Sequence, residues 1–185
     1  MLHNTFLNMK HSVAKIVLRP LHIALVAGLL LPLQALAAEV EVTWHEPSSY
    51  RDIQAAGSNQ SNFEQRVMEA FDAKFAELAA KLPADQRLHI TVTNVDLAGT
   101  VVMRDVGGTM QEYRYVRHMD FPYMELSYTL YDADGSVLQQ GEDKIKGREV
   151  PGQGLQTSQR RRGTNMLEYE SVMLDSWFKE TFEQS

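Results

Sequence analysis

Residues 62–82 read NFEQRVMEAFDAKFAELAAKL, and the rest of the chain is expected to pack around this stretch. Its apolar side chains recur at spacings of three and four residues, which places them along one face of a helix. Ser61 and Glu64 form a Ser-x-x-Glu capping box that predicts the helix start, and Pro83 ends the helix because proline has no amide hydrogen. Such a stripe needs a broad apolar surface opposite it, and a sheet is the predicted surface. The stripe consists of Phe63, Val67, Phe71, Phe75, Leu78 and Leu82.

Segments on both sides of this helix alternate polar with apolar residues, which is the period of a half-buried strand. Residues 39–44 and residues 88–93 are the first two predicted strands, and a change of phase after the second predicts a bulge near Asn94. Residues 123–145 predict a hairpin. Two short edge strands are expected around the glycine pair at 107–108.

The last predicted helix is apolar over a wide stripe, with Asn165 as its expected cap, and it follows a loop at residues 146–163 that we expect to be mobile. The order of elements predicts an α+β fold. We expect a two-layer sandwich, in which two helices pack on one face of a mainly antiparallel sheet of four to five strands. Polar residues should line the other face, namely Glu41, Thr43, His89, Thr91, Thr93, Glu125, Ser127 and Thr129.

Residues 1–37 have the parts of a secretory signal peptide: basic residues without acids, an apolar run at 21–33, and the ending Ala35-Leu36-Ala37. We expect cleavage before Ala38 and a single mature domain, residues 38–185, in the periplasm or secreted. The alternative is an uncleaved anchor, but the run is shorter than the about 20 apolar residues that span a bilayer. No transmembrane segment is expected after cleavage.

The composition excludes several kinds of chemistry. The chain has no cysteine, so it has no disulfide, no thiol nucleophile and no thiolate zinc site. Three of its 18 basic residues leave with the signal peptide, so 15 face 24 acids and the mature net charge is −9. This charge repels phosphate polymers and argues against nucleic-acid binding.

Several sequence blocks resemble a known family. The blocks are VTWHEPSSYRD at 42–52, LHITVTNVDLAG at 88–99, DFP at 120–122, the hairpin at 128–135 and the segment at 167–178. Together they are similar to the bacterial family catalogued as domain of unknown function 3016. Tyr123 stands where the family usually has arginine, and the 146–163 loop also departs from the pattern. The resemblance implies an exported bacterial protein without an assigned activity.

Two groups of charged residues are candidate binding residues. Asp96, Arg104 and Asp120 belong to the densest group of charges in irregular chain, and His118 is nearby in sequence. Paired carboxylates there could do acid–base work, and the plainer alternative is turn capping and surface ion pairs. The single basic run predicts a grip on an anionic group, with a solvated loop as its alternative. It consists of Arg160, Arg161 and Arg162.

No catalytic residue, metal site or cofactor is predicted, because the known nucleophile-elbow, zinc-binding and phosphate-loop motifs are missing. The favoured interpretation is a non-enzymatic interaction module of the bacterial envelope. Its polar sheet face and the Arg160 loop would contact an envelope protein or an anionic glycolipid. The alternatives are a small-ligand or metal-binding protein that uses Asp96, Arg104 and Asp120, and a hydrolase of unfamiliar arrangement.

Overall fold

The structure is a computed structural model that describes residues 37–117, 119–148, 154–156 and 166–183. The chain divides into two units, Met1–Gln34 and Ala35–Ser185, and all described residues belong to the second. Its main sheet has the strand order β1-β2-β5-β6, and a second sheet has the order β3-β4-β7. The main-sheet strands are β1 (Glu39–Trp44), β2 (Arg87–Asp96), β5 (Tyr123–Tyr131) and β6 (Val137–Lys146).

The main sheet combines one parallel pair with two antiparallel pairs. β1 runs parallel to β2, whereas β2, β5 and β6 are antiparallel in succession. The parallel pair arises because α1 (Gln60–Ala79) connects β1 to β2, and parallel neighbours require such a crossover. The register of β2 shifts between Val92 and Asn94, so the predicted bulge is confirmed.

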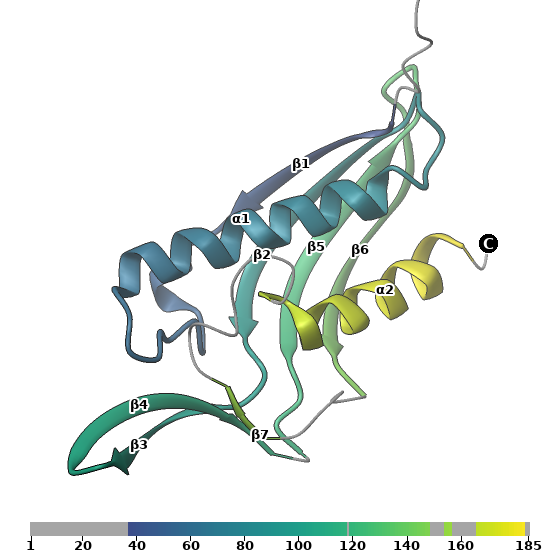
Figure 1. The fold of residues 1–185 in the computed structure, drawn as a ribbon. Helices are drawn as coiled ribbons and strands as arrows, with labels where there is room; N and C mark the ends of the chain where they lie inside the picture. The colour runs from purple at the N-terminus through teal and green to yellow at the C-terminus, as the bar shows by residue number, and fades with distance from the viewer. Residues whose placement is uncertain (1–36, 118, 149–153, 157–165, 184–185) are drawn as a thin grey trace, which may run out of the picture. The chain divides into compact units, whose positions relative to one another are not determined.

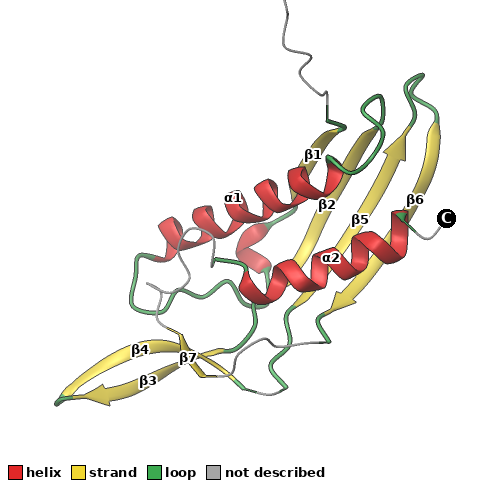
Figure 2. Ribbon diagram, turned by 45° about the vertical axis from the view of Figure 1, so that its right-hand side comes forward, coloured by secondary structure: helices red, strands yellow, loops and turns green. Residues whose placement is uncertain are grey.

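Both helices, α1 and α2 (Glu168–Phe182), lie on the same side of the main sheet (Figures 1 and 2). The predicted α+β sandwich of two helices on one face of a mainly antiparallel sheet is therefore confirmed. The core between the layers joins the α1 stripe to the inward residues of the sheet, all of them at most 3% exposed. These residues are Phe63, Val67, Phe71, Phe75, Leu78, Leu88, Ile90, Val92, Met124 and Leu126.

The ends of α1 differ from the sequence prediction. The helix begins at Gln60, and the Asn59 side chain caps it by accepting a 2.9 Å hydrogen bond from the amide of Asn62. The capping-box prediction was wrong because Ser61 already lies in the first turn, and Glu64 accepts from the Gln60 side chain instead. The helix ends at Ala79, and Leu82 follows in a turn.

Polar contacts at the edges of this core fix how the two helices lie. The Nζ of Lys74 on α1 is 2.8 Å from Asp175 on α2 and 2.9 Å from Glu77. The indole nitrogen of Trp177 donates to Asp143 on β6 at 2.8 Å. The expected cap of α2, Asn165, lies outside the described residues.

The second sheet is built on the hairpin of β3 (Thr100–Val106) and β4 (Thr109–Val116), which lies beyond one end of the main sheet (Figure 1). Gly107 and Gly108 make its turn with φ of 63° and 84°, a region that favours glycine. The strand β7 (Gly154–Gln156) pairs with β4. It falls in the stretch predicted as a mobile loop, and three residues are too few to show alternation.

Phe71→Ala is expected to lower the free energy of unfolding by about 3–5 kcal/mol, because Phe71 is fully buried and its removal leaves a cavity. Urea denaturation measures this loss. The matched control is Glu69→Ala on the same helix, where a surface change should stay within about 0.5 kcal/mol. Equal losses in the two variants would contradict the packing described above.

Candidate functional site

A buried arginine joins the second sheet to the main one. The Arg114 side chain on β4 is 2% exposed and forms a two-pronged ion pair with Asp52, at 2.7 Å from Nη1 and 2.9 Å from Nη2. Its remaining hydrogen bonds run to the carbonyl oxygens of Gln54 at 2.8 Å, Gly99 at 3.0 Å and Leu97 at 3.5 Å. Such a forked, charge-assisted contact fixes both distance and orientation. The segment after β1, the β2–β3 connection and the hairpin are thus tied to one guanidinium.

The β2–β3 connection passes very close to β4 at Gly99. Its φ is +85°, and a Cβ there would lie 2.7 Å from the carbonyl oxygen of Tyr115, which only glycine avoids. On the other side, the amide of Ala98 donates to the buried carboxylate of Glu170 on α2 at 2.9 Å. The backbone next to Asp96 is therefore fixed by β4 on one side and by α2 on the other.

This fixed backbone forms one wall of a cavity of about 470 Å³ at the end of β2 and the start of β5, which we call the end cavity. Asp96 and Asp120, both predicted as binding residues, line it together. Its other charged and aromatic lining residues come from three separate segments, and the sequence did not identify them as site residues. They are Arg51, Phe121, Tyr123 and Lys146.

Charges of both signs are arranged in this cavity. Burial raises the pKa of the Asp96 carboxyl, and the nearby charge of Asp52 raises it further. Arg51 opposes this rise, with its Nη1 at 3.4 Å from Asp96. The Arg51 guanidinium also lies over the Tyr123 ring at 5.9 Å, and the Lys146 ammonium lies over Phe121 at 5.8 Å. Asp96 is therefore an acid whose charge the folded protein disfavours.

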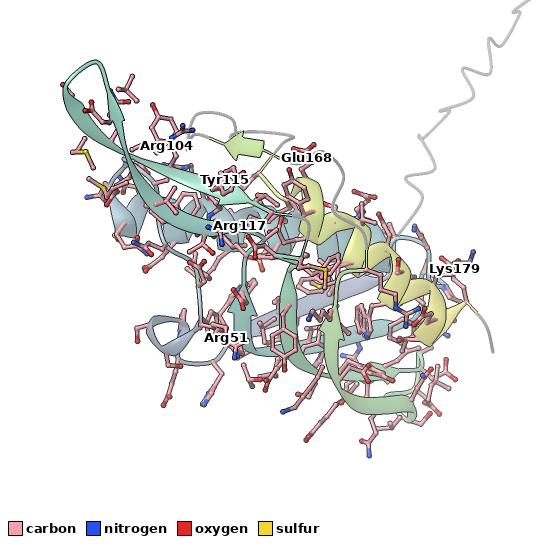
Figure 3. The ribbon with its side chains drawn as sticks, turned by 90° about the horizontal axis from the view of Figure 1, so that it is seen from below. Arg51, Arg104, Tyr115, Arg117, Glu168 and Lys179 are labelled. Atoms are coloured by element: carbon pink, nitrogen blue, oxygen red, sulfur yellow. The ribbon has the colours of Figure 1, made fainter. Side chains whose placement is uncertain are left out.

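The other predicted site residues have different surroundings. Asp120 accepts a hydrogen bond from the amide of Arg117 at 3.1 Å, so it shapes its own turn as well as lining the cavity. Arg104 is exposed on the β3–β4 hairpin and does not line the cavity, and Figure 3 shows it well apart from Arg51. His118 and the run at residues 160–162 lie outside the described residues.

One signal in the sequence could have identified Arg114. In Tyr113-Arg114-Tyr115-Val116 the arginine shares its strand phase with Val116, which is fully buried. An arginine on the inward phase of a strand requires a buried acid as its partner. Arg51 and Lys146 gave no comparable signal, because their positions depend on how distant segments meet.

The side chains of the end cavity are suited to polar binding. In the part of the chain that the structure describes, no group of three or more histidine, aspartate or glutamate side chains could hold a metal ion. Carboxylates accept hydrogen bonds from hydroxyl or ammonium groups, and the neighbouring cations attract anions. The cavity therefore suits a ligand or partner that carries both anionic and hydrogen-bond-donating groups.

The second face of the main sheet is an extended polar surface. Neither described helix covers it (Figure 2). The pairing registers align its residues in rows across the strands, such as Thr43, Thr91, Ser127 and Glu142. In the next row, His89 contacts Glu41 at 3.4 Å and packs against the Tyr131 ring with centroids 4.9 Å apart.

A family model described as "Protein of unknown function (DUF3016)" matches residues 38–180, which confirms the resemblance seen in the sequence. No curated protein and no solved structure matches the chain. Of the described helices, none is long and apolar enough to cross a membrane.

Asp52→Asn is expected to lower the free energy of unfolding by about 3–5 kcal/mol, because it leaves the Arg114 charge buried without its partner. Thermal and urea denaturation measure the loss. Asp85→Asn, which removes an exposed acid in a turn, is the control and should change stability by less than about 0.5 kcal/mol. A similar midpoint for both variants would show that the ion pair does not hold the second sheet.

Asp96→Asn is expected to have a higher free energy of unfolding than the wild type at pH 7. This difference should be smaller near pH 3.8, the ordinary pKa of the carboxyl group. The folded state raises the pKa of Asp96 and so holds its proton more tightly than the unfolded chain does. Acidification through the folded-state pKa of Asp96 therefore removes a destabilising charge from the wild type, whereas asparagine does not titrate, so the advantage of the variant shrinks. Urea unfolding at both pH values tests this, and an advantage of the variant that grows on acidification would refute the expected sign.

Proposed function

The chain belongs to the DUF3016 family, and we propose that it is an exported, non-enzymatic interaction module of the bacterial envelope, located in the periplasm or secreted. The observation that carries this proposal is the open polar face of the main sheet. A sheet whose other face is sealed by two helices offers this face as a rigid platform, because its strands are fixed by the core beneath them.

The size of the open face suits a protein partner. Four strands about 4.8 Å apart and nine residues with a rise of about 3.3 Å give a face of roughly 500–600 Å². One partner in a standard protein interface contributes about 800 Å². With the adjoining end cavity, the face approaches that area, and its mixed charges and hydroxyl groups favour a polar, hydrogen-bonding partner surface.

Export is supported by the signal-peptide features of residues 1–37 and by the absence of cysteine, which frees the fold from disulfide chemistry in an oxidising compartment. The non-enzymatic proposal is supported by the carboxylates of the predicted group. In the described part of the chain, Asp96 and Asp120 each bond to other groups and not to each other. A second candidate function is binding of a small ligand, which the end cavity favours.

Crosslinking in the native host, followed by capture from the periplasmic fraction, is expected to recover an envelope protein and a mature chain that begins at Ala38. Ser127→Arg places a bulky charge at the centre of the open face and should reduce the captured partner about tenfold or more. Ala76→Arg adds the same charge on the exposed side of α1 and should leave the yield unchanged. The proposal fails if both variants capture the partner equally well, or if the chain stays in the cytoplasm.

A further inference from the structure

A hollow at the end of β6 is lined by three cations. It measures about 470 Å³, and no acidic side chain of the described residues lines it. Phe121 and Lys146 also line the end cavity, so the two spaces adjoin. We call this space the cationic hollow, and its lining residues are Phe121, Lys144, Lys146, Gly147 and Arg148.

The backbone holds the hollow in shape. The amide of Gly147 donates to the carbonyl oxygen of Pro122 at 2.9 Å, which joins the end of β6 to the segment before β5. A Cβ at Gly147 would lie 2.8 Å from the Pro122 ring, so only glycine permits this approach. Phe121 and the two lysines are thus carried by backbone segments that are hydrogen-bonded to each other.

The cations of the hollow are available to a ligand. Lys144 and Lys146 are two residues apart on β6 and so share one face of the strand. Lys144 lies 3.6 Å from Glu125, and Arg148 lies 4.0 Å from Glu180. The two cationic side chains are 74% and 87% exposed, so both ion pairs are weak. Lys146 forms no ion pair with any residue that the structure describes. These three cations lie close together in a chain whose net charge is −6.

We infer that the cationic hollow and the end cavity form one binding site for a phosphorylated sugar. The phosphate lies in the hollow, where the Arg148 fork and the two lysine ammonium groups match its charge and its acceptor oxygens. The sugar hydroxyls donate to Asp96 and Asp120 in the adjoining end cavity. In the end cavity these carboxylates are balanced by Arg51 and Lys146, whereas the hollow is lined by cations without a described acid, and this difference in charge sets the direction in which the ligand binds.

This site goes beyond the proposed interaction with a partner and does not depend on it. The same ligand chemistry has two sources, a soluble sugar phosphate and the headgroup of a phosphorylated glycolipid. Calorimetry with glucose 1-phosphate, inorganic phosphate and glucose measures the soluble source. Co-sedimentation with phosphatidylcholine vesicles, with and without a phosphorylated glucosamine lipid, measures the membrane source.

We expect the mature protein to bind glucose 1-phosphate, or vesicles that contain the phosphorylated glycolipid, at least tenfold more tightly than inorganic phosphate, glucose or plain vesicles. The paired change Lys144→Gln with Lys146→Gln should weaken this binding tenfold or more. The matched control, Lys81→Gln with Lys179→Gln, removes the same charge from lysines that do not line either space, and it should stay within twofold. Melting midpoints of both double variants verify that they fold.

Asp96→Asn separates the two halves of the site. It should reduce the preference for glucose 1-phosphate over inorganic phosphate, since it alters the sugar side alone. Absence of binding to every probe would overturn the inference, as would equal losses in the two lysine double variants. Partner capture through the open face is a separate measurement, so failure of the ligand site and failure of the proposed function are distinguishable.

Discussion

A continuous chain of aromatic contacts holds the two layers of this protein together. Trp44 on β1 contacts Phe71 of α1 at a centroid distance of 5.8 Å, and Phe71 stacks on Phe75 at 6.5 Å. Phe75 meets the edge of Trp177 on α2 at 6.4 Å, and Trp177 meets Tyr128 on β5 at 5.8 Å. The chain has no cysteine, so stability depends on burying this apolar surface and not on crosslinks.

A buried ion pair connects the second sheet to the packed layers. Asp52 and Arg114 are both largely removed from water, so each charge is stable only with the other in place. Because the guanidinium also binds the carbonyl oxygen of Gly99, the pair positions the backbone beside Asp96. The core therefore fixes the position of the main sheet, and the ion pair fixes the connecting segments at the end of that sheet. The end cavity is the space between these segments.

The cavity and the open face have different binding characters. The face is broad and carries charges of both signs, which suits a large partner surface. The end cavity and the cationic hollow are concave and differ in charge: the hollow is lined by two lysines and an arginine, whereas the end cavity holds Asp96 and Asp120 together with Arg51 and Lys146. This difference gives a bound group a direction, which a uniformly charged surface does not. Both features lie on the same main sheet, so one rigid scaffold presents them.

The layers of the fold could be predicted from the sequence because the helical and strand periods of its apolar residues are local properties, and the family could be recognised from contiguous blocks of sequence. The sequence also identified Asp96, which is the last residue of β2, and Asp120, which precedes β5 at the same end of the sheet. It did not identify Arg51, Arg114 or Lys146 as their neighbours, since these come from segments far apart in the chain. Which charges meet depends on the folded arrangement, because strand order and register, and not sequence distance, set which segments lie side by side.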